Sequence, residues 1–303
     1  VDADNPLTAR VTVNRFWQQV FGTGLVKTTE DFGAQGEIPV QMDLLNWLAW
    51  QFRQDGWDIK KLMRMIVTSH TYRQSSRMES PEAHERDPDN RLLARGARYR
   101  LPAWMLRDQA IAAAGLLSPL GEGPAVNSYQ PAGIWEEASF GKKKYVRDEG
   151  EKLYRRSLYT FWRRIIAPTM FFDNASRQTC TVKSSRTNTP LHALQTLNNV
   201  SYVEAARALA QLAWKSTRES DAARIDIVTR RILARKASSA EKRVLLAGLN
   251  RTRQHFSEQI DSAERLLAQG QSPRDDSLDP VELASWTCLC LAVLNLDETL
   301  NRE

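Results

Sequence analysis

The stretch Asp58-Ile59-Lys60-Lys61-Leu62-Met63-Arg64-Met65-Ile66-Val67 shows most directly what kind of fold this chain adopts. Its apolar side chains recur at i, i+3, i+4, i+7 and i+8 from Ile59, which places them on one face of an α-helix. Asp58 stands just before the first of them, where an aspartate caps free N–H groups at a helix start. The stretch therefore predicts an amphipathic helix that buries one face in a core.

The same helical period recurs on both sides of this stretch and makes the predicted fold mainly α. It appears in residues 7–21, 44–52, 102–117, 191–212, 225–233, 239–269 and 280–300. Pro6 suits the first turn of one helix, and Ser238 to Glu241 resembles a capping box at the start of another. Near alternation of side-chain types over 153–162 favours one short strand. We expect an irregular helical domain with long loops and at most one small β element.

The helical pattern breaks between Gly121 and Gly150, where Gly, Pro, Asn, Ser and charged residues dominate. These residue types favour turns over helices. A stretch of this length without regular structure commonly binds something or is mobile. We therefore predict an N-terminal helical part (1–120), a loop-rich polar segment with room for short strands (121–190) and a C-terminal helical part (191–303). We expect the three parts to form one integrated domain.

Composition limits the class of function. The chain has 303 residues, of which 42% are hydrophobic, so it can bury a sizeable core. Its formal net charge is +6, and the charges are mixed along the chain except in the basic run Gly141-Lys142-Lys143-Lys144. Nucleic-acid-binding proteins usually cluster their basic residues and carry a recognised module. Nucleic acid is therefore a disfavoured partner.

The cysteines and histidines form no metal-binding or haem-attachment motif. The three cysteines lack CxxC spacing, and no two of the four histidines stand at i, i+4. Cys288 and Cys290 lie in an apolar run that is too short and too interrupted to span a membrane. Cys180 is expected to be a buried, inert thiol, since a cysteine nucleophile needs a neighbouring base. We predict no metal, cofactor or membrane span in this chain.

Motifs that follow one another along most of the chain resemble a known family. They include Asn5-Pro6-Leu7-Thr8-Ala9-Arg10-Val11, Val13-Asn14-Arg15-Phe16-Trp17, Phe21-Gly22-Thr23-Gly24-Leu25-Val26, Tyr72-Arg73-Gln74-Ser75-Ser76, Asn90-Arg91-Leu92-Leu93, Tyr154-Arg155-Arg156-Ser157-Leu158-Tyr159 and Thr187-Asn188-Thr189-Pro190-Leu191. This series resembles the domain of unknown function 1553 found in planctomycete-type proteins. His192 departs from the family pattern, which more often has glutamine there.

The resemblance implies a setting for the chain but no activity. Such domains form the C-terminal part of large exported proteins that also carry a c-type-haem-like segment, so any haem would lie elsewhere in the parent protein. The resemblance implies an exported or periplasmic location, with the other domains of the parent as partners. It also implies association with sulfatase-rich polysaccharide metabolism, which suggests an acidic polysaccharide as ligand. Whether the chain is an enzyme stays open.

Polar side chains crowd the segment from Arg155 to Asn199 and make it the candidate binding region. Arginine forks match carboxylate and sulfate oxygens, although these arginines could equally pair with acids and hold loops together. Asn188 either caps the helix that follows or leaves an N-terminus suited to an anion. Tyr129 and Trp135 lie in the Gly/Pro-rich loop and are expected to be exposed for stacking on sugar rings. The predicted binding residues are Arg155, Arg156, Arg177, Arg186, Asn188, Tyr129 and Trp135.

Acid/base chemistry has weaker candidates. Carboxylates and imidazoles are the usual proton carriers, and the candidates here are Asp173, Asp108, Glu136 and His192. Glycosidase chemistry needs two carboxyl groups at a defined separation, which sequence does not provide. The leading hypothesis is a module that binds an acidic (sulfated or uronic) glycan or a partner domain. The alternative is an enzyme that acts on that polysaccharide.

Overall fold

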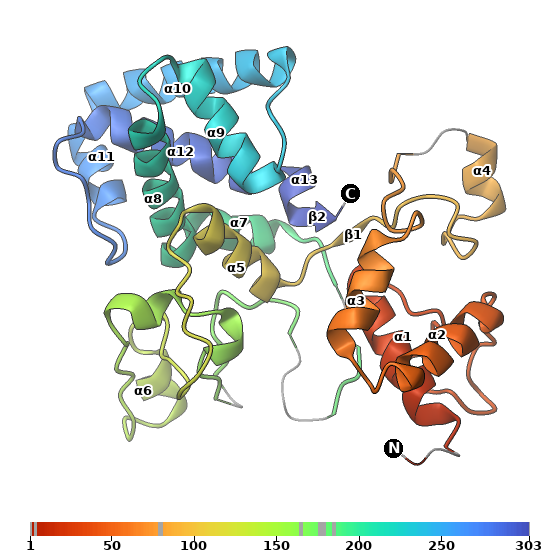
Figure 1. The fold of residues 1–303 in the computed structure, drawn as a ribbon. Coiled ribbons are helices and arrows are strands. Elements are labelled where there is room, and N and C mark those ends of the chain that lie inside the picture. The colour runs from red at the N-terminus through yellow and green to blue at the C-terminus, as the bar shows by residue number, and fades with distance from the viewer. Residues whose placement is uncertain are drawn as a thin grey trace. The chain divides into compact units, whose positions relative to one another are not determined.

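The computed structural model describes residues 2, 5–77, 81–163, 166–174, 180–183 and 186–302. Helices dominate these residues, which contain a single two-stranded sheet (Figure 1). The predicted mainly α fold with at most one small β element is confirmed. The chain divides into two compact units. Unit 1 is Val1–Arg100, Thr181–Ser184 and Asn301–Glu303, and unit 2 is Leu101–Cys180 and Ser185–Leu300. The three-part division made from the sequence stays a prediction.

Unit 1 is a small helical unit closed by the sheet. Its elements are α1 (Leu7–Phe21), α2 (Met42–Gln54), α3 (Ile59–Thr68), α4 (Pro81–Arg86) and the antiparallel strands β1 (Tyr99–Arg100) and β2 (Asn301–Arg302). The carboxylate of Asp58 accepts a hydrogen bond from the N–H of Lys61 at 3.0 Å, which confirms the predicted cap of α3. The core forms where α1, α2 and α3 meet, from residues that include Val13, Trp17, Leu45, Leu48, Phe52, Leu62 and Ile66.

The buried side-chain amide of Asn14 holds the loop that follows α1. Asn14 is fully buried in α1, and its side chain donates to the carbonyl of Val26 at 3.1 Å and accepts from the Val26 N–H at 2.9 Å. The chain passes so close to Asn14 that a β-carbon on Gly24 would lie 2.6 Å from its Nδ2 atom. The loop that follows α1 therefore needs both the asparagine and the glycine for its shape.

Unit 2 contains most of the helices. They are α5 (Ala103–Ala113), α6 (Ile134–Ala138), α7 (Pro190–Asn198), α8 (Val200–Ser216), α9 (Asp221–Leu233), α10 (Ser239–Glu258), α11 (Ile260–Leu267), α12 (Pro280–Leu294) and α13 (Asp297–Leu300). Helix α12 packs against α8, α10 and α11, and its apolar sequence buries residues on every side, including Trp286 and Leu283. The core of unit 2 therefore lies around α12 and the alanine-rich α8.

The short strand predicted over 153–162 is wrong. Residues Gly150–Tyr154 and Ser157–Tyr159 form two 3-10 helices, η1 and η2, and Thr160 makes one isolated bridge with Val126. The carboxylate of Asp108 accepts from the Ser157 N–H at 2.9 Å and from the Ser157 hydroxyl at 2.6 Å. Side-chain partners thus occupy polar groups that a strand would pair with another strand.

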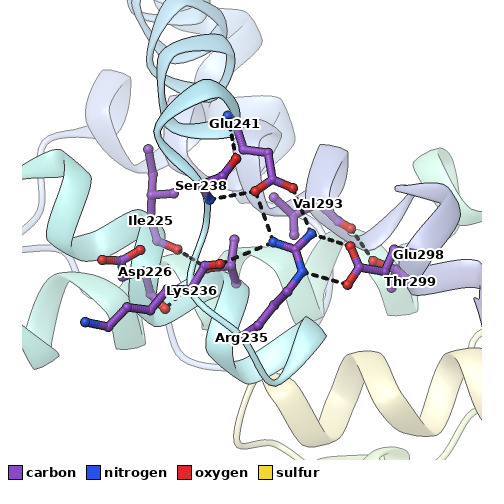
Figure 2. A network of polar contacts seen from close by, with 10 residues as sticks. Ile225, Asp226, Arg235, Lys236, Ser238, Glu241, Val293, Glu298 and Thr299 are labelled. Carbon is purple, nitrogen blue, oxygen red and sulfur yellow. Dashed lines mark hydrogen bonds and ion pairs between the residues drawn. The ribbon is translucent and has the colours of Figure 1, made fainter. Parts of the chain in front are cut away.

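An arginine between two glutamates joins the link after α9 to α10 and α13. Figure 2 shows Arg235 between Glu241 and Glu298, with Nε of Arg235 2.7 Å from Glu298 Oε1 and Nη2 2.7 Å from Glu241 Oε1. Glu241 also accepts from the Ser238 N–H at 2.7 Å, while the Ser238 hydroxyl accepts from the Glu241 N–H at 3.3 Å. The predicted capping box at the start of α10 is therefore confirmed.

This network predicts a pH-dependent contribution to stability. Hydrogen bonds from Arg235 lower the pKa of Glu241 from 4.5 to about 2. A carboxyl group with a lowered folded-state pKa stabilises the fold above its unfolded pKa, and the contribution is lost as the pH falls. In urea unfolding, we expect Glu241→Gln to be less stable than the wild type above pH 4.5, with the difference vanishing toward pH 2.

The matched control for this titration is Glu258→Gln, which changes an exposed glutamate at the far end of α10. It is expected to leave the pH profile close to that of the wild type. A stability difference between the wild type and Glu241→Gln that persists undiminished at pH 2 would contradict the assignment.

Candidate functional site

Trp135 lies at the centre of an aromatic cluster in the loop-rich part of unit 2. Its ring centroid lies 5.2 Å from that of Tyr145 and 5.9 Å from that of Phe161. The guanidinium carbon of Arg163 lies 5.3 Å from the Trp135 ring centroid, within reach of a cation–π interaction. Because Phe161 is exposed, this cluster reaches the surface as an aromatic ring with a cation close by.

The segment Ser139–Arg147, which we call the basic loop, begins at this cluster. The Ser139 hydroxyl donates to the carbonyl of Trp135 at 2.6 Å and accepts from the N–H of Lys143 at 2.9 Å. The Ser139 hydroxyl therefore ties the first half of the basic loop to α6.

The second half of the basic loop is held from the segment before α6. The Tyr145 hydroxyl donates to the carbonyl of Ser128 at 2.7 Å, and the Asn127 amide donates to the carbonyl of Val146 at 2.8 Å. Asp148, just beyond the loop, accepts from the N–H of Asn127 at 2.7 Å. Anchors at both ends reduce the conformational entropy that the loop would lose on binding a ligand.

Four exposed cations belong to the basic loop: Lys142, Lys143, Lys144 and Arg147. Among the residues that the structure describes, no carboxylate lies within ion-pair distance of any of them. The Arg147 guanidinium carbon lies 5.1 Å from the ring centroid of Tyr129. The basic loop therefore concentrates positive charge on a fixed backbone, which suits an anion with several charged groups.

Arg155 is buried and supports the loop region instead of facing solvent. Its guanidinium donates to the carbonyl of Pro124 at 2.7 Å and to the carbonyl of Glu122, and it lies 4.0 Å from the Tyr159 ring centroid. These contacts occupy the fork that was predicted to bind an oxyanion. Arg155 thus holds residues 122–124 against η2.

The other predicted polar binding residues differ in exposure. Arg156 is exposed and makes no ion pair with a described residue. Asn188 is exposed, and Arg186 is half-buried. Arg177 lies outside the described residues.

The exposure predicted for Tyr129 and Trp135 is wrong, since their side chains are 8% and 7% exposed. The Tyr129 hydroxyl accepts from the N–H of Gln271 at 2.9 Å, and burial, with Glu204 nearby, raises its pKa. The Gly/Pro-rich sequence indicated a surface loop, but the rings of that loop turn inward and form its small core. Phe161 and the cations of the basic loop are exposed instead.

Residues 1–249 match the model of the PSD1 family, described as a protein of unknown function (DUF1553). The chain belongs to the DUF1553 family. The resemblance seen in the sequence motifs is thereby confirmed. Comparison with curated proteins and comparison with solved structures found no match. The part that matches DUF1553 includes Trp135 and the whole basic loop.

Two of the acid/base candidates in this DUF1553 chain lie close together. Nε2 of His192 is 3.7 Å from Oδ1 of Asp173. Asp173 also accepts from the N–H of Thr187 at 2.6 Å and from its hydroxyl at 2.9 Å. The His192 ring is buried and stacks on Phe172, with centroids 4.0 Å apart. Asp173 therefore links the chain just before α7, at Thr187, to His192 in the first turn of α7.

The remaining acid/base candidates belong to other groups. Asp108 is hydrogen-bonded to Ser157, whereas Glu136 lies in α6, where its backbone carbonyl accepts from the Gly141 N–H at 2.7 Å. Asp108 therefore caps η2, and no direct contact joins it to the Asp173–His192 pair among the interactions of the described residues.

Sequence reasoning missed two buried charged residues in α8. Glu204 and Arg207 are almost fully buried, and Glu204 accepts from the Tyr154 hydroxyl at 2.8 Å and from the Gln271 N–H at 2.6 Å. Arg207 donates to the carbonyl of Ser272 at 2.6 Å. Both residues interrupt an otherwise apolar stretch of the sequence, and this placement of charges could have flagged them.

The thiols differ from one another in exposure. Cys180 is exposed, so its predicted burial is wrong. Cys288 and Cys290 lie in α12 as expected, and burial raises the pKa of Cys288 to about 11. Within the described ranges, no group of three or more His, Cys, Asp or Glu side chains is placed to hold a metal ion. No helix in those ranges has the length and apolar character to cross a membrane.

Proposed function

We propose that the chain is a noncatalytic binding module of an exported multidomain protein, and that it binds an acidic, sulfated or uronic glycan at the basic loop. One observation carries the proposal: the basic loop holds four exposed cations that have no ion pair with a described residue. An anion bound there would gain charge-assisted hydrogen bonds without displacing a carboxylate. The exported setting and a haem in another domain of the parent remain parts of the proposal.

The aromatic cluster supports a sugar polymer as ligand. Phe161 is exposed near the Trp135 ring, and the apolar C–H faces of sugars suit flat aromatic surfaces. Arg155 contributes indirectly, because it holds the neighbouring segment in place. An acidic face of a partner domain is the other ligand that this charge distribution would accept.

The test removes three charges from the basic loop. We expect Lys142→Gln/Lys143→Gln/Lys144→Gln to weaken binding of dextran sulfate about 10- to 30-fold at physiological salt, because each exposed ion pair contributes up to about 1 kcal/mol. Isothermal titration calorimetry at two salt concentrations would measure the affinity. The salt dependence of binding should also fall, since fewer counterions are exchanged.

The matched control is Lys236→Gln/Arg243→Gln/Arg251→Gln, which removes the same charge from exposed positions outside the basic loop. This variant is expected to bind almost as the wild type does. Equal losses in the two triple variants, or a wild type that does not bind dextran sulfate, would contradict the proposal.

An enzyme that acts on polysaccharide is the second candidate, favoured by the distance of 3.7 Å between His192 Nε2 and Asp173 Oδ1. In that case the wild type would release reducing ends from the polysaccharide. Asp173→Asn and His192→Gln would each abolish this release while dextran sulfate binding persisted. Binding without product release would leave the noncatalytic module as the function.

A further inference from the structure

Phe140 ends helix α6 in a left-handed backbone conformation, with φ of 51°. The Phe140 N–H donates to the carbonyl of Glu137 at 3.2 Å, and the Gly141 N–H donates to the carbonyl of Glu136 at 2.7 Å. This pair of hydrogen bonds forms a Schellman motif, in which glycine usually occupies the position of Phe140. A β-carbon disfavours the left-handed conformation, so phenylalanine strains the helix end where glycine would not.

The side chain of Phe140 is too exposed to offset this strain by packing. It is 93% exposed, whereas Trp135 in α6 is 7% exposed. Packing therefore does not explain why a large aromatic residue stands here. A strained backbone and an exposed apolar ring are both features that concentrate at binding sites.

Phe140 is also part of the turn that presents the cations of the basic loop. The N–H of Lys142 donates to the carbonyl of Ser139 at 3.1 Å, so the chain turns tightly across Phe140 and Gly141. The ring thus belongs to the same short, hydrogen-bonded turn as the first lysine. The two lysines that follow Lys142 are exposed as well.

We infer that Phe140 is a ligand-contact residue, and that it stacks on the apolar face of a sugar ring whose sulfate or carboxylate groups bind Lys142, Lys143 and Lys144. This inference rests on the proposed function and names the feature that selects the ligand. A ring placed next to cations favours a polyanion with apolar faces between its charges. Charged polysaccharides have such faces, and polyphosphate does not.

An anionic membrane also combines apolar and charged groups, but the geometry favours the sugar. Membrane binding grows with the apolar area that enters the bilayer, and one phenylalanine ring supplies little of it. A single ring is instead matched in size to one sugar face. Vesicle binding is therefore included among the outcomes of the test.

The experiment compares Phe140→Gly with the wild type in the full chain. We expect Phe140→Gly to weaken dextran sulfate binding about fivefold, as for loss of one aromatic contact, and to leave polyphosphate binding unchanged. The melting temperature should stay the same or rise by about 2 °C, because glycine relieves the left-handed strain. The matched control is Leu158→Ala, which truncates an 84% exposed apolar residue of η2 and should change neither affinity nor melting temperature.

Each outcome separates the inference from the proposed function. A wild type that binds neither polyanion overturns both. Dextran sulfate binding that depends on the three lysines but is unchanged in Phe140→Gly overturns the inference alone. A lower melting temperature in Phe140→Gly shows a structural role and also overturns it. Binding to vesicles of phosphatidylserine and phosphatidylcholine that requires Phe140, without any effect on dextran sulfate, replaces the sugar with a membrane surface.

Discussion

Replacing Glu204 with alanine is expected to destabilise unit 2 by about 3–5 kcal/mol, as for removal of one partner from a buried polar network. Glu204 is 1% exposed and accepts from the Tyr154 hydroxyl and from the N–H groups of Gln271 and Ser272. Burial, together with Glu204, raises the pKa of Tyr154, so this hydroxyl stays a donor. Alanine would leave these donors buried without their acceptor, and each unsatisfied group costs about 1–3 kcal/mol.

Urea unfolding followed by circular dichroism would measure this loss. The matched control is Glu204→Gln, which keeps an acceptor oxygen and nearly the same volume while removing the charge near Arg207. We expect it to lose roughly half as much stability as the alanine variant, because hydrogen bonds to neutral groups are weaker than those to charged groups. A Glu204→Ala protein as stable as the wild type would show that water or another acceptor satisfies these donors.

The second large effect is expected for Arg107→Met. Arg107 is buried in α5 and donates to the carbonyls of Arg155 and Leu153 at 2.9 and 2.7 Å and to the Ser157 hydroxyl at 3.2 Å. Burial lowers the pKa of Arg107, while Asp108 opposes this shift. Methionine fills much of the space but donates no hydrogen bond. We expect a loss of about 3 kcal/mol and faster proteolysis near η1 and η2.

Arg107→Lys is the control that keeps the positive charge but removes the planar guanidinium. Lysine keeps the positive charge, but its single ammonium group does not reproduce the planar array of donors. Its stability should fall between those of the wild type and Arg107→Met. Identical stability of all three proteins would show that the carbonyls of Leu153 and Arg155 find other donors.

The helical part of this fold could be predicted because its causes are local. The apolar stripe of α3 and the caps at Asp58 and Ser238 act within a few residues of one another, and the structure has them as expected. The strand predicted over 153–162 failed for the opposite reason. Its backbone groups are taken by Arg107 and Asp108, nearly fifty residues away in the sequence. No pattern within the segment itself shows that such distant partners exist.

The candidate site was only partly predictable, because residue type does not reveal burial. Arginine is suited both to binding anions and to holding carbonyls, and Arg155 does the second. The lysine run was visible in the sequence, yet its anchoring through Ser139 and Tyr145 depends on contacts with the chain around α6. The left-handed backbone of Phe140 was also hidden, since glycine follows it and would be the expected residue at such a turn.

The hydrogen bonds of Glu204 also indicate which residues unit 2 needs in order to fold. The family match stops at Leu249, whereas two of the donors to Glu204 come from residues 271 and 272. Helix α12, which supplies much of the unit 2 core, also lies after that point. A polypeptide truncated at 249 would retain the basic loop but lose two N–H groups that donate to the buried Glu204 carboxylate. The core of unit 2 therefore extends past the residues that match the family model.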